Sequence, residues 1–184
     1  MYHKFLNDKS YFQFLCKTDQ DLAKQTKELG CRFCHAAVHV SNYMRKPRGG
    51  DDLPEDLSLR LSFSCSRDGC RKRAMPPSIR FLGRFVYWSV HVILISAMLN
   101  FGPSSLAKIS DKFGIDIKTI KRWRRWWQDF FPTTKFWKEL KGKILESIVN
   151  FPLDLLMTFE KNSSRQDSIT AFLQTIKELR EFNK

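Results

Sequence analysis

The spacing of apolar residues predicts a mainly α-helical chain with one short region of β-strands. Apolar positions recur at helical spacing near the N-terminus and through most of the chain beyond residue 84. Between these regions, the segment 57–65 alternates apolar and polar residues, which predicts a strand. Another strand is predicted over 37–43, with an exposed loop rich in Gly, Pro and acid between the two. The residues expected on the buried face of 57–65 are Leu57, Leu59, Leu61 and Phe63.

The parts of the chain before and after the strands are both predicted to be helical. Near the N-terminus, Thr18 and Asp21 resemble a capping box, and Gly30 is placed to end the helix. A buried helix is predicted over about 84–100. The C-terminal helices should complete the core or present an apolar face to a partner or a second copy, and another helix should start at Pro152. Their apolar stripes comprise Phe136, Trp137, Leu140, Ile144, Leu145 and Ile148 in one helix, and Ile169, Phe172, Leu173, Ile176 and Leu179 in the last.

Two helices joined by a tight turn are predicted between residues 104 and 128. Gly114 fits the turn because a positive φ is unstrained for glycine, and Asp116 can cap the second helix through the amides of Lys118 or Thr119. This pattern is typical of a DNA-binding helix-turn-helix, although an ordinary helical hairpin with a solvated basic face shares much of it. The residues expected to face inward are Ile109, Phe113, Ile115, Ile120, Trp123 and Trp127.

Charge points to a polyanionic partner. The chain has 32 Lys and Arg against 19 Asp and Glu, a formal net charge of +13. Clustering of the cations favours nucleic acid over a generally basic surface or a membrane. On the second helix we expect base-edge contacts from Lys118, Thr119, Lys121 and Arg122, and phosphate contacts from Arg124 and Arg125. Around the strands we expect further phosphate contacts from Arg71, Lys72, Arg73, Arg45, Lys46 and Arg48, continued by Arg80 and Arg84.

Four of the five cysteines form two close pairs with the spacing C-x2-C-x30-C-x4-C. The pairs are Cys31 with Cys34 and Cys65 with Cys70. Zinc prefers a tetrahedral shell of thiolates, and each pair can bend into a knuckle that offers two of them. Asp68 and Gly69 supply residues suited to such a bend. We therefore predict one structural Zn²⁺ ion in a zinc ribbon, with Cys16 left over as a core residue.

Two alternatives compete for the first cysteine pair. The letters CRFCH also match a c-type haem attachment motif, but haem requires an oxidising compartment and leaves Cys65 and Cys70 unexplained. A zinc shell that includes His35 or His39 is the other alternative. The N-terminus lacks the features of a signal peptide, and the apolar segment 85–101 is shorter than the roughly 20 residues of a spanning helix. The expectation is a cytoplasmic, nucleoid-associated protein without a membrane partner.

Several segments of the sequence resemble those of a known protein family. The runs YMRKPRGG, RLSFSCSRDGCRKRAMPPSIRFLGRFVY and RWRRWWQDFF resemble small bacterial proteins encoded within or beside transposable elements. The resemblance implies an architecture of a zinc ribbon followed by a helix-turn-helix. That architecture is similar in plan to the DNA-binding front half of insertion-sequence transposases. In that family the residue after the first cysteine pair is commonly glycine. Here it is His35, which argues against a required histidine ligand.

These features lead to one functional hypothesis and two alternatives. We expect a zinc-stabilised, double-stranded-DNA-binding accessory or regulatory protein of a mobile element, which recognises element ends or a promoter. The alternatives are an adaptor that recruits a transposase or recombinase through its C-terminal helices, and an RNA-binding module. No enzyme activity or small-molecule substrate is expected, because the helical residues that follow the helix-turn-helix offer no sheet for a carboxylate triad. The expected regions are 1–30 (N-terminal helical), 31–83 (zinc ribbon), 84–132 (helix-turn-helix) and 133–184 (C-terminal helical).

Overall fold

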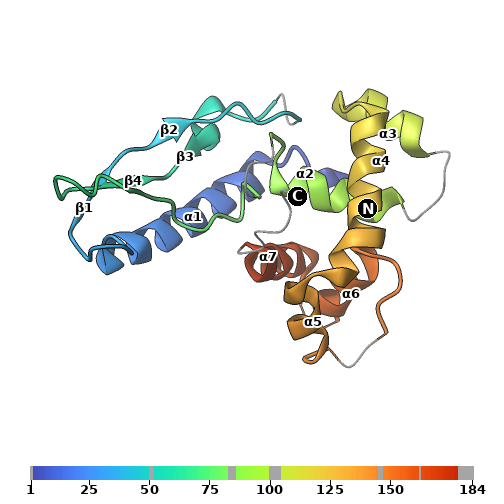
Figure 1. Ribbon diagram of the computed structural model, residues 1–184. Coiled ribbons are helices and arrows are strands. Elements are labelled where there is room, and N and C mark those ends of the chain that lie inside the picture. Colours follow the sequence, from blue (N-terminus) through green and yellow to red (C-terminus); the bar gives the residue numbers. More distant parts are fainter. Residues whose placement is uncertain are drawn as a thin grey trace.

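Figure 1 shows a mainly helical protein in which one long helix connects a small group of strands to a group of shorter helices. This computed structural model describes residues 2–49, 52–82, 86–99, 105–144, 147–161 and 163–177. The α-helices are α1 (Lys9–Leu29), α2 (Ser89–Met98), α3 (Ser105–Phe113), α4 (Ile117–Arg125), α5 (Lys135–Lys141), α6 (Leu153–Glu160) and α7 (Arg165–Ile176). Short 3-10 helices span His3–Phe5, Glu55–Ser58 and Phe131–Thr133, and a π-helical segment, Trp126–Phe130, continues α4.

The strands form two small antiparallel sheets rather than one long ribbon. The strands are β1 (Val38–Val40), β2 (Tyr43–Met44), β3 (Leu59–Arg60), β4 (Phe63–Cys65) and β5 (Arg73–Ala74). One sheet has the order β1-β4-β5, with Val38 opposite Cys65, and the other pairs β2 with β3. The expected fold class, mainly α with a small amount of β, is therefore confirmed at this level.

The predicted continuous strand over 57–65 is wrong. Leu57 lies in a 3-10 helix, and the remainder is divided between β3 and β4. The polar residues Arg60 and Ser62 are buried, so the two faces do not separate apolar from polar side chains. Each buried side chain has a polar partner that makes burial tolerable: the Arg60 guanidinium donates to the Pro76 carbonyl at 2.6 Å, and the Ser62 hydroxyl hydrogen-bonds with the Ser41 hydroxyl at 3.1 Å.

Helix α1 begins earlier than the sequence pattern indicates. Its N-cap is Asp8, whose carboxylate accepts from the Tyr11 amide at 3.1 Å, and Thr18 lies inside the helix. The predicted capping box is therefore wrong: the Thr18 hydroxyl donates to the Phe14 carbonyl one turn earlier, a bond that a helix interior permits. Gly30 ends the helix as predicted, with a φ of 70°.

Helix α1 contributes to two clusters of buried residues. Its N-terminal half packs with α2, where Phe12 contacts Trp88 edge to face at a centroid distance of 5.0 Å. This larger cluster extends through α3, α4 and the C-terminal helices. The smaller cluster lies under the strands and consists of Ala23, Cys31, Val38, Phe63, Cys65 and Ala74. The strand region therefore has little apolar core of its own.

Helix α2 is surrounded by other elements. All its residues from Ser89 to Ala97 are buried, as the sequence predicted for a core helix, although it begins later than expected. Residues 84 and 100, the predicted ends, lie outside the described residues. Within the part of the chain that the structure describes, no helix has both the length and the apolar character needed to cross a bilayer.

The C-terminal helices complete the larger core. Helix α5 ends at Lys141, so the predicted stripe to Ile148 on a single helix is wrong; Gly142 follows directly, and glycine is a poor continuing residue. Pro152 is the N-cap of α6, at the predicted start. Leu145 and Leu179 lie outside the described residues. The apolar stripe of α7 is fully buried against the same chain, in particular against α6: it comprises Ile169, Phe172, Leu173 and Ile176. That face is therefore not free for a partner.

A buried ion pair joins α1 to the segment that follows the strands. Asp19 and Arg80 are both almost completely buried, and Arg80 Nε donates to Asp19 Oδ2 at 2.8 Å. The same carboxylate accepts from the Ser78 hydroxyl and the Ile79 amide, while the guanidinium also donates to the carbonyls of Leu57 and Leu59. The expectation that Arg80 extends an exposed basic cluster is wrong, and Arg84 lies outside the described residues.

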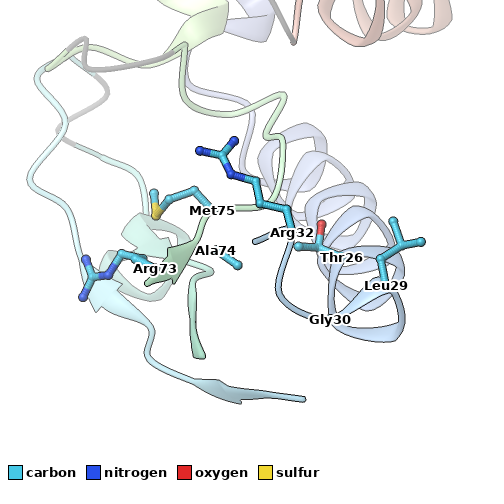
Figure 2. A pocket seen from close by; sticks show the side chains of 7 residues that line it. All are labelled: Thr26, Leu29, Gly30, Arg32, Arg73, Ala74 and Met75. Carbon is cyan, nitrogen blue, oxygen red and sulfur yellow. The ribbon is translucent and has the colours of Figure 1, made fainter. Parts of the chain in front are cut away.

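A pocket of about 200 Å³ lies between the C-terminal end of α1 and β5 (Figure 2). It is lined by Thr26, Leu29, Gly30, Arg32, Arg73, Ala74 and Met75.

We expect Asp19→Ala to lower the free energy of unfolding by about 3–5 kcal/mol, because it leaves the buried Arg80 guanidinium without its counter-ion. Urea denaturation followed by circular dichroism measures this. Asp21→Ala, at an exposed position on the same helix, is the matched control and should change the free energy by less than about 0.5 kcal/mol. A similar small effect for both variants would contradict the assigned role of Asp19.

His91 on α2 is a second buried polar residue, with a different character. Its ring lies among Phe12, Phe113 and Gly49, and neither ring nitrogen has a hydrogen-bond partner among the described residues. Burial lowers the pKa of His91 to about 3, so the folded protein holds the neutral ring at neutral pH.

This burial makes stability depend on pH. Below the ordinary pKa of 6.5, the unfolded chain gains a proton at His91 that the folded chain does not, so stability falls by about 1.4 kcal/mol per pH unit toward pH 3. We expect His91→Leu to remove this contribution. The measurement is the difference in unfolding free energy between the two proteins at several pH values from neutral to mildly acidic, which cancels other titrating groups. If the unfolding free energies of the wild type and His91→Leu differed by the same amount at every pH, a contribution of His91 to the pH dependence would be excluded.

Candidate metal centre and nucleic-acid interface

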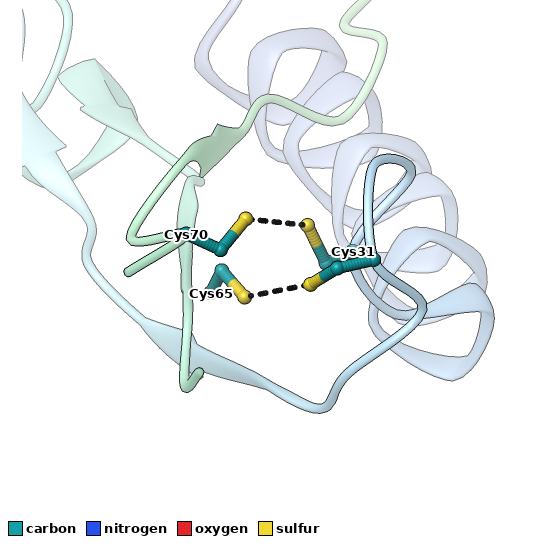
Figure 3. Close-up of side chains that lie close together, drawn as sticks. Cys31, Cys65 and Cys70 are labelled. Atoms are coloured by element: carbon teal, nitrogen blue, oxygen red, sulfur yellow. Dashed lines mark hydrogen bonds between the residues drawn. The ribbon is translucent and has the colours of Figure 1, made fainter. Parts of the chain in front are cut away.

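The four cysteines of the two predicted pairs converge on one point. Figure 3 shows sulfurs from the two pairs facing one another across a small gap. The Sγ atoms of Cys31 and Cys70 are 3.8 Å apart, those of Cys34 and Cys65 are 3.4 Å apart, and all four lie within 4.8 Å of one another. Cys31 and Cys65 are buried and the other two are half-buried. This group could hold a metal ion.

Local backbone geometry builds each half of the cluster. In the first pair, the Cys31 amide donates to the Ala36 carbonyl and the His35 amide donates back to the Cys31 carbonyl at 2.7 Å. His35 has a φ of 55°, a conformation that glycine adopts most easily. In the second pair, Gly69 has a φ of 81°, as its predicted turn role requires, and the Cys70 amide donates to the Arg67 carbonyl.

Four adjacent thiols cannot all ionise without a cation. The backbone amide of Phe33 donates to the Cys31 sulfur and, with further hydrogen bonds, lowers the pKa of Cys31 to about 6. At Cys65 the Arg67 amide also lowers the pKa, but burial and the neighbouring thiols outweigh it and raise the pKa to about 12. A bound cation removes this conflict, because it stabilises every thiolate at once.

The cluster fits a tetrahedral metal site. Metal–sulfur bonds of about 2.3 Å place the sulfurs of a regular tetrahedron about 3.8 Å apart, close to the two short separations here. Among the described residues no histidine or carboxylate belongs to the group. His35 and His39 are exposed, which favours four thiolates over a histidine-containing shell. Convergence of all four cysteines also favours a metal ion over haem attachment at the first pair alone.

The paired helices α3 and α4 form the second candidate site. Asp116 caps α4 as predicted, accepting from the amides of Lys118 at 2.8 Å and Thr119 at 3.4 Å. Gly114 has the positive φ, 59°, that the turn requires. The predicted inward residues are all buried: Ile109, Phe113, Ile115, Ile120, Trp123 and Trp127.

The opposite face of α4 is basic and open to solvent. Lys118, Lys121, Arg122 and Arg125 are exposed, and Arg124 is half-buried. The expectation that Thr119 faces outward is wrong. It is only 9% exposed, and its hydroxyl accepts from the Arg122 guanidinium at 3.3 Å. Thr119 is therefore placed to orient Arg122 rather than to reach a ligand itself.

The basic residues near the strands differ in their surroundings. Arg45 is half-buried with its guanidinium 5.1 Å from the Phe81 ring centre, so it is less available than predicted. The exposed Arg71 pairs with Asp68. Lys72 lies 4.2 Å from the Phe33 ring centre and Arg73 lies 5.3 Å from that of Tyr43. Lys46 and Arg48 are exposed in the connection after β2.

Arg32, which lies between the first two cysteines, is not among the site residues predicted from the sequence. Its exposed guanidinium is 4.7 Å from the Phe33 ring centre, on the same surface as Lys72. Only its position inside the first cysteine pair could have drawn attention to it.

Comparisons with protein-family models, with curated proteins and with solved structures found no match for this chain.

We expect Cys31→Ser and Cys70→Ser each to abolish metal binding, because three thiolates leave the shell incomplete. Elemental analysis of protein purified without added chelator should give one metal ion per wild-type chain and none for either variant. Cys16→Ser, outside the cluster, is the control and should retain the metal. Full metal content in both cluster variants would exclude this site.

Proposed function

We propose that this chain is a zinc-stabilised protein that binds double-stranded DNA, chiefly through the exposed face of α4. The observation that carries the proposal is the division of that helix into a buried apolar face and a basic face free of carboxylates. Five of the nine residues from Ile117 to Arg125 are Lys or Arg, and none is acidic. A surface evolved only for solubility usually mixes both signs of charge.

Zinc is the metal that this ligand set favours. Four cysteine thiolates in a closed tetrahedral arrangement are typical of structural zinc, whereas harder cations prefer oxygen ligands. A closed shell leaves no coordination position for substrate, so the ion would stabilise the strands rather than take part in a reaction. The small apolar cluster beneath the strands supports such a role, because it contains only six buried residues, two of them cysteines of the site.

The arrangement of α3 and α4 supports a helix that enters a DNA groove. In a helix-turn-helix the second helix lies in the major groove, and residues near its N-terminus reach base edges. Lys118, Lys121 and Arg122 occupy that part of α4. The Thr119 hydroxyl holds the Arg122 guanidinium, which favours a defined orientation suited to the O6 and N7 acceptors of guanine.

Duplex DNA fits this face better than duplex RNA. The major groove of B-form DNA is wide enough to admit a helix, whereas the deep, narrow major groove of A-form RNA is not. The exposed cations near the strands that lie outside the pocket of Figure 2, Lys46, Arg48 and Lys72, would contact phosphates and add affinity without sequence preference. The finer role, at the ends or promoter of a mobile element in the nucleoid, rests only on the resemblance of the sequence and stays a prediction.

We expect binding to duplex DNA to weaken steeply with salt. If about six cations meet phosphates, the slope of log K against log salt concentration should be roughly −5. Lys121→Glu should weaken binding at least about tenfold, because it places a carboxylate on the contact face of α4. Fluorescence anisotropy with fragments selected from random duplex DNA measures both quantities.

Lys138→Glu provides the matched control, since it makes the same charge change at an exposed position of α5. It should affect DNA binding by no more than the loss of net charge, about twofold. An affinity for duplex DNA that does not change with salt concentration would contradict the proposal. An equal loss of DNA affinity in Lys121→Glu and Lys138→Glu would also contradict it. Stronger competition by duplex RNA than by duplex DNA at equal salt would assign the surface to RNA.

A further inference from the structure

The pocket between α1 and β5 lies outside the basic face of α4 and combines apolar and cationic walls (Figure 2). Leu29 and Met75 supply apolar side chains, and Ala74 is a buried part of the lining. Arg32 and Arg73 contribute the cations, from the first cysteine pair and from β5. Its volume, about 200 Å³, is enough for one aliphatic or aromatic side chain, since an apolar protein cavity of about 150 Å³ accommodates benzene.

Both arginines are available for an anionic partner. They are exposed, and neither forms an ion pair with a carboxylate among the described residues. Each guanidinium lies over an aromatic ring, that of Arg32 over Phe33 and that of Arg73 over Tyr43. Such packing fixes the direction of a guanidinium while leaving its N–H groups free to donate.

Large apolar side chains are unusually exposed at this end of the molecule. Leu29 is 79% exposed, Phe33 48% and Met75 44%. Leu29 and Met75 line the pocket itself, and Phe33 adjoins it through Arg32. Exposed apolar residues bordered by arginine are characteristic of the centre of a protein–protein interface.

We propose that this pocket binds a short acidic segment of a partner protein. One apolar side chain of that segment enters between Leu29 and Met75, and flanking carboxylates pair with Arg32 and Arg73. The proposal is independent of DNA binding by α4 and goes beyond it.

A nucleic-acid base is a poorer occupant. Proteins hold unpaired bases by stacking them on aromatic rings and by hydrogen bonds to their edges. The pocket lining contains no aromatic side chain and no amide or carboxylate side chain, and Thr26 is its only uncharged polar side chain. Phe33 is already covered by Arg32 and Lys72.

A second copy of this chain is also a poorer occupant. Its own acidic stretch, residues 52–56, has a suitable composition. However, Leu53 packs against the larger core of the same chain, so it is not free to enter a pocket on another molecule.

The pocket borders the cysteine cluster, because both of its arginines are close in sequence to cysteines of that cluster. Arg32 lies between Cys31 and Cys34, and Arg73 follows Cys70 by three residues. A metal ion that joins the two cysteine pairs would therefore fix the separation of the two arginines.

The test is a selection of random linear peptides, displayed on phage, against the full metal-loaded chain. Enriched peptides are then synthesised, labelled and titrated by fluorescence anisotropy. We expect them to combine Asp or Glu with a single Leu, Ile, Met or Phe. Leu29→Ser and Arg32→Glu should each weaken their binding at least about tenfold, a typical effect for a central contact. Both positions are exposed, so both variants should keep the metal content and melting temperature of the wild type.

Val149→Ser and Lys138→Glu are controls at exposed positions elsewhere, and should leave peptide binding unchanged. Lys121→Glu should lose DNA binding and retain peptide binding, which separates this proposal from the proposed function. Three results would overturn the inference: no common peptide motif, equal binding of the motif to Leu29→Ser, or saturable binding of oligo(dT) that Leu29→Ser abolishes. The last result would reassign the pocket to single-stranded nucleic acid.

Discussion

The buried pair of Asp19 and Arg80 determines how the two ends of this protein are joined. A charged side chain removed from water is tolerated only when its partners satisfy it, and here the partners come from three separate segments of the chain. Asp19 belongs to α1, Arg80 follows the strands, and the guanidinium also reaches the carbonyls of Leu57 and Leu59. One set of polar contacts thus fixes the long helix, the start of β3 and the approach to α2. Apolar contacts have no preferred direction, so they would permit these segments to pack in more than one relative position. Hydrogen bonds are directional and therefore specify one arrangement.

Patterns that depend on local chemistry could be predicted from the sequence. The cap at Asp116, the turn at Gly114 and the inward stripe of α4 depend on residues close together in the chain, and all three are present. The convergence of four cysteines could also be predicted, although it spans many residues, because thiol pairs at this spacing have few other uses. The start of α1 was less predictable than these features. Thr18 has the form of a cap, but the apolar face of α1 continues on its N-terminal side and the helix continues with it.

Long-range polar contacts were beyond prediction. A charged residue in a sequence is expected at the surface unless a partner is known, and no pattern links Asp19 to Arg80, a residue 61 positions later. The same reasoning failed for Arg80, counted as part of a basic surface, and for Arg60 in β3, expected on the polar face of a strand. The same reasoning was also wrong for Thr119, which was expected to face solvent. A polar side chain at the edge of the exposed face of a helix can be buried when a neighbour such as Arg122 supplies a hydrogen bond. The count of cations in this sequence therefore overstates the charge available to a partner.

The basic face of α4 and the pocket at Arg32 and Arg73 are supported by different parts of the protein. The face of α4 rests on the large apolar core, which requires no metal. The pocket at Arg32 and Arg73 rests on the small cluster beneath the strands, which includes two of the cysteines. If the cysteine cluster holds a metal ion, loss of that ion should therefore disturb the pocket first and leave α4 in place. Helix α1 is one connection between the two regions, and the buried ion pair at Asp19 anchors that helix midway. The connection after β2 is another, because the Arg48 amide donates to the Val86 carbonyl just before α2. An anchored helix resists displacement, so the two proposed sites are better suited to act at once on one scaffold than to form a switch in which one site controls the other.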